Sequence, residues 1–311
     1  MEQEQQFDAI IVGGSYAGLS AALILGRSLR KVLVIDSGKP CNRQTPHSHS
    51  FLTRDGETPA QIAAVAREQL LKYPTVSFLA DRVIDAKKTV DGFVVRTITD
   101  QQFDAKKLIL ATGVEDSMPA IPGFAACWGI SVLHCPYCHG YEVHGQQLGI
   151  IANGDTAYEM AWHIQHWSPN MTLFTNGPAT ISDEHRQIIA ALNIPIIEKE
   201  IAAIEHQHGQ LKTLRFTDGT DHVLDAVFSR VAFRQHSDLA QRLGCKIDEP
   251  GYISVSAFGE TSIPGVYAAG DNSSPMRQVL VAATKGNLAG VMINRTLIEE
   301  KIAALSAQTA N

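Results

Sequence analysis

Apolar and polar stretches follow one another along the chain in an order that predicts a strand, a turn, a helix and a strand. The apolar run FDAIIVGG at 7–14 precedes a helix-like stretch at 16–30 and a second apolar run, KVLVIDSG, at 31–38. This order is a βαβ unit, and its two strands are expected to be parallel because a helix connects them. The same half continues with a predicted helix and three strand-like runs, at 59–73, 76–83, 93–99 and 107–111.

The layout returns in the middle of the chain. A strand, a turn, a helix and a strand are predicted again, at 148–152, 153–155, 156–167 and 171–175. Ser182 is placed to cap a helix that ends near Leu192. Three strand-like runs follow, at 194–204, 210–217 and 226–233, and the last residues, SAQTAN, are expected to fray. We therefore predict an α/β fold of two doubly wound Rossmann-like domains, each with a small β-meander.

Composition narrows the class of protein. A length of 311 residues predicts two domains, and an apolar share of 45% is typical of a globular chain. No apolar run approaches the ~18–20 residues that span a bilayer, and the start, MEQEQQFDAI, has no leader pattern. A net charge of −6 without a basic stripe argues against nucleic acid as a partner. Five cysteines, an odd number, predict a reducing, cytoplasmic location instead of a disulfide scaffold.

The first glycine turn has the features of a dinucleotide site. It comprises Gly13, Gly14, Ser15, Tyr16, Ala17 and Gly18, between a strand and a helix. In the pattern G-x-G-x-x-G the glycines permit a tight turn, close approach to a pyrophosphate and close packing of helix on strand. Gly13 and Gly18 match, whereas Ser15 stands at the second glycine position. Asp36 ends the second strand, where an acid can bind ribose hydroxyls and disfavours a 2′-phosphate. A turn without a ligand is the alternative.

Cys135 and Cys138 form a CxxC pair in the string CPYCH. A glutaredoxin-type site would need a small fold around the pair, and haem attachment would need export. A zinc site would need a second CxxC or a suitably spaced pair of histidines, so no metal is predicted. A redox dithiol is favoured, because two intervening residues bring the sulfurs together and His134 and His139 flank the pair. The other cysteines, Cys41, Cys127 and Cys245, are expected to be packing residues or lone thiols.

The string TSIPGVYAAGD at 261–271 resembles the second flavin-binding signature of the pyridine nucleotide–disulfide oxidoreductases. The resemblance implies that FAD is the cofactor and that Asp271, after Gly270, hydrogen-bonds its ribityl chain or phosphates. Further positions assigned to FAD by resemblance to the family are Val83, Ala111, Thr112, Gly113, Arg277, Gln278 and Val279. Arg43, after the acid of the second strand, either reaches the FAD phosphates or ring or lies in a solvated loop. Two loop histidines, His47 and His49, either line the flavin site or face solvent.

The place of HCPYCHGYE between the two domains is similar to that in the low-molecular-weight thioredoxin reductase family. That resemblance implies that Cys138 lies nearer the flavin and that Cys135 exchanges with substrate. The family commonly has an acid after the second cysteine, where this chain has His139, a residue able to carry the proton of exchange. In this respect the chain is more like the fungal and bacterial dithiol oxidases of the family. The implied partners are a thioredoxin-like protein or a small dithiol or disulfide, and the implied assembly is a homodimer.

The second glycine turn departs from the family pattern. Ala152 replaces its first glycine, and the next strand end, FTNG at 174–177, lacks the paired arginines that grip a 2′-phosphate. The nearest arginine downstream is Arg186. NADPH is therefore a doubtful cofactor.

These inferences define one predicted enzyme. Residues 1–114 and 240–311 form a discontinuous FAD-binding domain, and residues 115–239 form an inserted NAD(P)-binding-like domain with the CxxC pair. The predicted function is FAD-dependent thiol–disulfide oxidoreduction through Cys135 and Cys138, without the usual use of NADPH. An O2-dependent dithiol oxidase and a flavin redox sensor without turnover are the alternatives.

Overall fold

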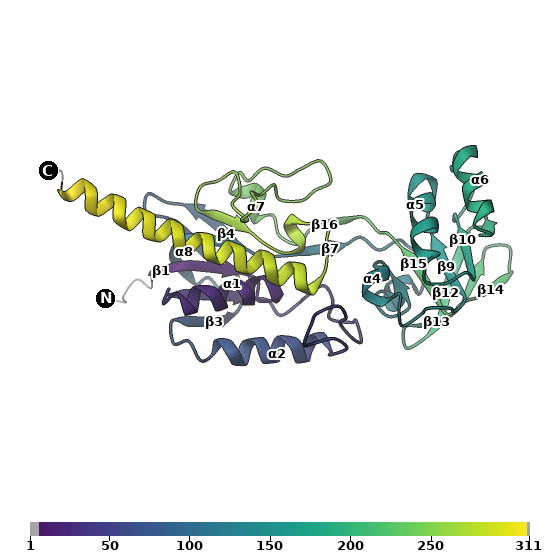
Figure 1. The fold of residues 1–311 in the computed structure, drawn as a ribbon, viewed down its shortest axis with the longest axis horizontal. Coiled ribbons are helices and arrows are strands. Elements are labelled where there is room, and N and C mark those ends of the chain that lie inside the picture. Colours follow the sequence, from purple (N-terminus) through teal and green to yellow (C-terminus); the bar gives the residue numbers. More distant parts are fainter. Residues whose placement is uncertain (1–5, 310–311) are drawn as a thin grey trace. The chain divides into compact units, whose positions relative to one another are not determined.

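The computed structural model describes residues 6–309, and the first five residues of the stretch MEQEQQFDAI lie outside them. The chain forms two compact units, each with its own core (Figure 1). The first unit contains the chain up to Arg43, Ala60–Glu115 and the chain from Phe233. The second contains Gln44–Pro59 and Asp116–Ala232. The segment Gln44–Pro59 therefore groups with the unit that carries the CxxC pair, a detail absent from the predicted domain boundaries.

A seven-stranded sheet forms the centre of the first unit, in the order β3-β2-β1-β6-β5-β4 with β17 beside β6. These strands are β1 (Gln6–Val12), β2 (Val32–Asp36), β3 (Val76–Ala80), β4 (Val83–Lys88), β5 (Phe93–Thr97), β6 (Gln102–Leu110) and β17 (Val266–Ala268). β1 pairs in parallel with β2 and β6, as the βαβ pattern predicts. β4, β5 and β6 form an antiparallel meander. The predicted run at 76–83 is thus two strands, because the chain turns at Asp81 and Arg82.

Helices cover the first unit, with the longest at the C-terminus. They are α1 (Tyr16–Arg27), α2 (Pro59–Leu70), α7 (Leu239–Arg242) and α8 (Val279–Thr309). α1 and α8 cross closely, since a Cβ on Gly286 would lie 1.9 Å from the carbonyl oxygen of Ala17. The expectation that SAQTAN frays is wrong for residues 306–309, which continue α8. Residues 310–311 lie outside the described part.

The second unit repeats the parallel frame in a smaller form. Its five-stranded sheet has the order β11-β10-β9-β15-β8. The strands are β8 (Val132–Leu133), β9 (Leu148–Ile151), β10 (Met171–Phe174), β11 (Ile196–Ile197) and β15 (Ala226–Ser229). A three-stranded antiparallel meander accompanies it, with β12 (Ile201–Gln207), β13 (Gln210–Phe216) and β14 (Asp221–Val223). The predicted α/β fold with two Rossmann-like units is confirmed.

The helices of the second unit are short. They are α3 (Phe124–Cys127), α4 (Pro136–His139), α5 (Gly154–Ile164) and α6 (Asp183–Ala191). The predicted cap of α6 is present, because the backbone N–H of His185 donates to the Ser182 hydroxyl over 3.2 Å. β7 (Val114–Asp116) and β16 (Phe233–Gln235) pair where the chain passes between the units.

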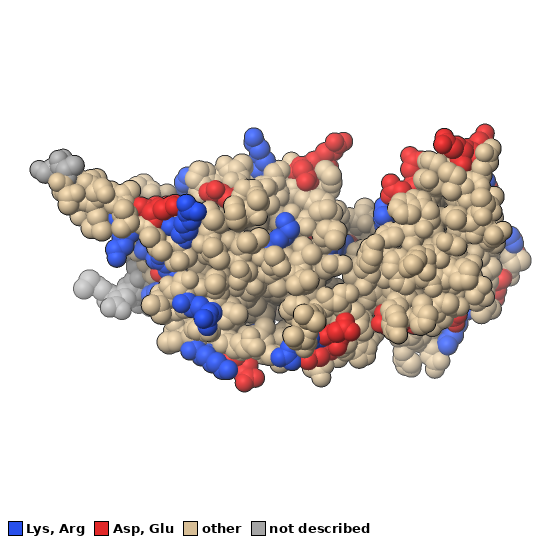
Figure 2. Space-filling model, viewed as in Figure 1, with Lys and Arg blue, Asp and Glu red and all other residues tan. Residues whose placement is uncertain are grey.

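Surface charge agrees with the balance read from the sequence. On the face drawn in Figure 2, lysine and arginine side chains are scattered and form no continuous stripe. Across residues 6–309, no helix has the length and apolar character to cross a membrane.

Candidate functional site: a dithiol turn and a glycine-lined strand edge

The cysteine pair forms a disulfide at the start of the short helix α4. Cys135 precedes the helix in an extended conformation, and the two Cα atoms lie 5.3 Å apart. The backbone N–H groups of Cys138 and His139 both donate to the carbonyl oxygen of Cys135, over 3.2 Å each. Pro136 follows Cys135 at the first helical position, where its missing N–H costs nothing. The sequence thus folds the pair into one tight turn.

Aromatic side chains of the second unit support α4 from α5 and the residues after it. Gly140 ends the turn, and a Cβ there would lie 2.6 Å from the Trp167 ring. The ring of Tyr137 lies edge-on to Trp167, with centroids 5.4 Å apart, and its hydroxyl is 3.2 Å from Nε2 of His163. Tyr137, one of the two residues between the cysteines, is therefore held by these contacts, although 60% of it is exposed.

The segment 44–59 supports the other part of the turn. The Ser50 hydroxyl donates to the carbonyl oxygen of Tyr137 over 3.2 Å. Gln44 donates its side-chain amide to the carbonyl oxygen of Trp128 over 2.5 Å. The ring of His49 lies perpendicular to that of His139, with centroids 6.3 Å apart. A four-residue helix cannot hold its own shape in water, so these contacts fix the dithiol.

His139 is partly buried next to the disulfide. Burial lowers the pKa of its imidazole below the usual value, the Glu142 carboxylate opposes that change, and His49 adds to it. A lowered pKa keeps the ring neutral near pH 7, which is the form that accepts a proton from a thiol. The second flanking histidine, His134, lies next to Trp128, with the centroids of the two rings 6.2 Å apart.

The first glycine turn lies where parallel strands of the first unit end. Gly13 has φ of +110°, and a Cβ there would lie 2.2 Å from the carbonyl oxygen of Ala111. A Cβ on Gly18 would lie 1.9 Å from the carbonyl oxygen of Gly13. Ser15 precedes α1 and makes no side-chain cap, so the first amides of a 12-residue helix are not capped by that side chain. This backbone matches the frame that receives a pyrophosphate at a helix N-terminus.

Asp36 has a protein partner. Its carboxylate accepts from Nη2 of Arg67, on α2, over 2.7 Å. A Cβ on Gly14 would lie 2.8 Å from the Asp36 side chain. The acid therefore lies against the glycine turn, as its position at the strand end predicts.

The AAGD segment joins the same strand edge. The backbone N–H of Ala269 donates to the carbonyl oxygen of Leu110 over 3.1 Å, and Asn272 donates its side-chain amide to that oxygen over 2.8 Å. The other amide atom, Oδ1 of Asn272, is fully buried and has no partner. Asp271 is mostly buried, with Cys41 Sγ at 3.5 Å and Arg277 Nε at 3.8 Å from its Oδ2. A buried acceptor without a partner, near the glycine turn, is suited to receive a hydrogen bond from a bound ligand.

The structure brings most of the predicted cofactor residues to this edge. Ala111, Thr112 and Gly113 directly follow the last residue of β6. The Thr112 hydroxyl lies 3.3 Å from the Asn272 amide nitrogen. The Tyr16 hydroxyl accepts from Asn42 over 3.3 Å. Other predicted positions in the first unit are Val83, buried at the start of β4, Arg43, exposed in a loop, and Gln278 and Val279, at the start of α8.

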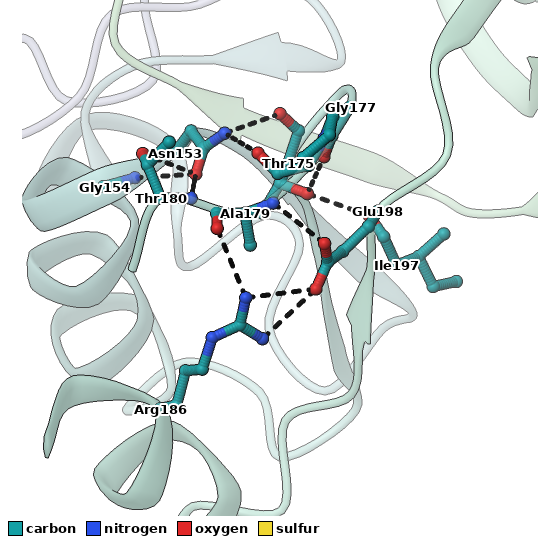
Figure 3. Close-up of polar contacts among 10 residues, drawn as sticks. Asn153, Gly154, Thr175, Gly177, Ala179, Thr180, Arg186, Ile197 and Glu198 are labelled. Carbon is teal, nitrogen blue, oxygen red and sulfur yellow. Dashed lines mark hydrogen bonds and ion pairs between the residues drawn. The ribbon is translucent and has the colours of Figure 1, made fainter. Parts of the chain in front are cut away.

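The second glycine turn is closed by the chain's own side chains (Figure 3). Asn153 Oδ1 accepts from the backbone N–H groups of Gly154 and Thr180, over 2.8 Å each. Its amide nitrogen donates to the carbonyl oxygens of Thr175 and Pro178, over 3.3 and 2.9 Å. The side chain at the start of α5 thus ties down the loop that follows β10.

Arg186 is engaged in the same cluster. Its guanidinium donates to the Glu198 carboxylate over 3.1 and 3.2 Å and to the carbonyl oxygen of Ala179 over 3.3 Å. The pKa of Glu198 is lowered mainly by the hydrogen bond from the Ala179 N–H and next by the one from Arg186. The carboxylate therefore stays charged and paired with the arginine. The nearest arginine to this turn is therefore already paired.

Sequence reasoning missed the neighbours of the dithiol. Glu142, Asp55 and Trp167 had no assigned role, and His49 was considered only for the flavin site or the surface. Glu142 is only four residues from Cys138, whereas Asp55 and His49 come from the segment 44–59 and Trp167 from the chain after α5, both far from the cysteines in sequence. Among residues 6–309 no cluster of three or more His, Cys, Asp or Glu side chains forms a metal site.

Comparison with known proteins assigns a family to this arrangement. The family described as pyridine nucleotide-disulphide oxidoreductase matches residues 7–286. "Thioredoxin reductase tcpT" of Claviceps purpurea is 35% identical over 307 residues, which cover 94% of this chain and 95% of that protein. The putative thioredoxin reductase TrxB of Bacillus anthracis is 30% identical with a TM-score of 0.90, over 95% of this chain and 99% of that one. An oxidoreductase from Agrobacterium tumefaciens is 36% identical with a TM-score of 0.89, over 94% and 99% of the two chains.

The chain belongs to the pyridine nucleotide-disulphide oxidoreductase family. Within that class it is an FAD-dependent disulfide oxidoreductase of the low-molecular-weight thioredoxin reductase-like type.

The glycine turn yields the first testable prediction. Gly13→Ala should abolish retention of FAD, because the new Cβ meets the Ala111 carbonyl and the backbone has φ of +110°. The measurement is the ratio of flavin to protein absorbance after purification. Ser15→Gly, which restores the family pattern, is the matched control and should keep the flavin. A Gly13→Ala protein as yellow as the wild type would contradict the assignment.

Proposed function

We propose that this chain catalyses thiol–disulfide exchange between a substrate dithiol or disulfide and the Cys135–Cys138 pair, with electrons passing to or from bound FAD. The observation that carries the proposal is the disulfide in a tight turn next to His139, whose pKa is lowered by burial. Cys135 is the sulfur that exchanges with substrate, and Cys138 is the sulfur nearer the flavin. His139 carries the proton.

The first unit is proposed as the FAD-binding domain and the second as the inserted domain. The glycine turn at 13–18 and the N-terminus of α1 would hold the pyrophosphate, and Asp36 the ribose. Asp271, with the buried Asn272 amide beside it, would bind the ribityl chain. When bound, FAD supplies two-electron redox chemistry to the dithiol.

The exchange step conserves atoms and electrons. A substrate thiolate attacks Cys135 Sγ, which forms a mixed disulfide and breaks the Cys135–Cys138 bond. The second substrate thiol then attacks the mixed disulfide, and the substrate leaves oxidised while both cysteines are reduced. Of the two S–H protons of the substrate, neutral His139 accepts one, which leaves Cys138 as the thiolate, and the Cys135 sulfur takes up the other. The reverse sequence reduces a substrate disulfide.

The second glycine turn supports the proposal that NADPH is not the usual electron donor. Asn153 fills the position at which a phosphate would meet the α5 N-terminus, and Arg186 is paired with Glu198. Acidic side chains gather over α5 and α6 in Figure 2, where the helices carry Asp155, Glu159, Asp183 and Glu184. A 2′-phosphate would meet carboxylates there instead of a bidentate cation.

This geometry favours an O2-dependent dithiol oxidase as the second candidate function. An oxidase of this kind takes its electrons from the substrate dithiol and delivers them through FAD to O2, so it needs no nicotinamide donor. A thioredoxin-like protein and a small dithiol are both compatible with the exposed turn at Tyr137. The reducing compartment implied by the odd cysteine count, the cytoplasm, would keep such dithiols reduced.

The exchange proposal predicts the response of the flavin to thiols. Anaerobic mixing of the holoprotein with dithiothreitol should bleach the flavin, and Cys138→Ser should abolish bleaching while FAD stays bound. Cys245→Ser is the matched control, because Cys245 is buried in the first unit and outside the disulfide. Return of the colour in air with release of peroxide would favour the oxidase. A flavin that no dithiol bleaches would contradict exchange and favour the sensor.

The state of the second glycine turn predicts the response to nicotinamide. NADPH should leave the flavin oxidised under anaerobic conditions in which dithiothreitol bleaches it. Stopped-flow absorbance of the two reactions side by side is the measurement. Bleaching by NADPH as fast as by the dithiol would refute the proposal and make the chain a conventional reductase.

We also propose that the chain is a homodimer. The exposed face of α8 carries apolar residues at heptad-like spacing, namely Val291, Ile298, Ile302 and Leu305, with 42 to 57% of each exposed. A second copy of the same helix face would cover them.

The dimer proposal can be tested by light scattering after size exclusion. The wild type should show twice the chain mass of 33.8 kDa, and Ile302→Glu should shift the population to the monomer. Lys301→Glu places the same acid on the neighbouring exposed position and should leave the dimer intact. A monomeric wild type would overturn the proposal.

A further inference from the structure

A row of acidic and imidazole side chains lies beside the dithiol turn in the second unit. Nε2 of His49 is 3.4 Å from Oε1 of Glu142, and its Nδ1 is 3.7 Å from Oδ1 of Asp55. The His49 ring in turn lies edge-on to His139. Each nitrogen of the His49 ring therefore faces a carboxylate, and the ring connects both carboxylates to the neighbourhood of His139.

The row is held in place by the backbone of the segment 44–59. Oδ1 of Asp55 accepts from the backbone N–H of Ser50 over 2.7 Å. The N–H of Ser48 donates to the carbonyl oxygen of Glu57 over 2.8 Å, and the N–H of Gly56 to that of Ser48 over 2.9 Å. The loop is thus closed on itself, and it positions the His49 ring against α4.

The exposed fraction of the side chains increases from the partly buried His139 and His49 to the two carboxylates. The His49 side chain is 20% exposed, Glu142 39% and Asp55 66%. The charged groups that act on His139 are Glu142, which favours its protonated form, and His49, which disfavours it. The backbone N–H of His139 donates to the carbonyl oxygen of Cys135, and His163 of α5 contacts Tyr137 of α4.

We propose that Glu142, oriented by His49 and Asp55, is a positioning residue that stabilises the protonated form of His139 during thiol–disulfide exchange. The inference rests on the proposed exchange at Cys135. When a substrate thiol gives its proton to neutral His139, the Glu142 carboxylate offsets the positive charge that develops on the ring. The Glu142 carboxylate is 3.4 Å from Nε2 of His49, whose ring lies edge-on to His139, so it acts on His139 by its charge and does not take the proton itself.

The test is the rate at which dithiothreitol reduces the Cys135–Cys138 disulfide in a single anaerobic turnover, from pH 5 to 9. Acid quenching, alkylation and mass spectrometry count the thiols directly, so the readout does not depend on the flavin. His139→Asn should slow the reaction by about 100-fold, the typical contribution of a general base. Glu142→Gln should slow it by roughly tenfold, because the base remains but loses its carboxylate.

The pH profile separates a positioning role from a merely structural one. Removal of the carboxylate lowers the pKa of His139 further, so the acid limb of the Glu142→Gln profile should move to lower pH while the plateau falls. Glu142→Asp should recover part of the plateau. His49→Phe should lower the plateau as well, and the double variant should lose no more than Glu142→Gln alone, because both residues act through one pair.

Glu159→Gln is the matched control, since this exposed carboxylate of the same unit pairs with Arg230. It should keep the wild-type rate and profile. A wild-type disulfide that dithiothreitol does not reduce would defeat the proposed function itself. A reactive wild type whose acid limb is unchanged in Glu142→Gln would leave exchange intact and overturn the positioning role.

Discussion

The first unit depends on backbone atoms that approach one another more closely than any side chain permits. Gly13 lies against the carbonyl oxygen of Ala111, Gly18 against that of Gly13, and Gly286 against that of Ala17. These contacts bring the ends of β1 and β6 and the helices α1 and α8 to one place. These close approaches are possible only because none of the three positions carries a Cβ.

The two units share a parallel βαβ arrangement but differ at the start of the helix that follows each glycine turn. In the first, the amides at the start of α1 have no side-chain cap from Ser15, and a buried Asn272 oxygen near the end of β6 has no partner. In the second, Asn153 caps α5 and binds the loop after β10. The Asn153 oxygen occupies the first amide of α5, that of Gly154, so that donor is bonded within the protein although the parallel sheet is retained.

The dithiol depends on tertiary contacts more than on its own helix. α4 has four residues and is held by Trp167 from one element and by Ser50 and His49 from another. This arrangement lets the turn remain exposed at Tyr137 while His139 is partly withdrawn from water. Exposure gives a substrate access to the disulfide, and burial keeps the imidazole in its basic form.

The sequence by itself determined the two βαβ frames, the glycine turn, the AAGD strand end and the CxxC pair, because each depends on residues adjacent in the chain and on apolar periodicity. Prediction from the sequence failed where the local pattern of apolar and polar residues is weak. The SAQTAN tail lacks apolar periodicity, yet residues 306–309 continue α8 from the helix before them. Only the tertiary structure decided that the segment 44–59 brings His49 to α4, with Asp55 beside it, and that Asn153 and Arg186 both bind the loop after β10. These contacts join residues far apart in sequence, and no local propensity encodes such a distance.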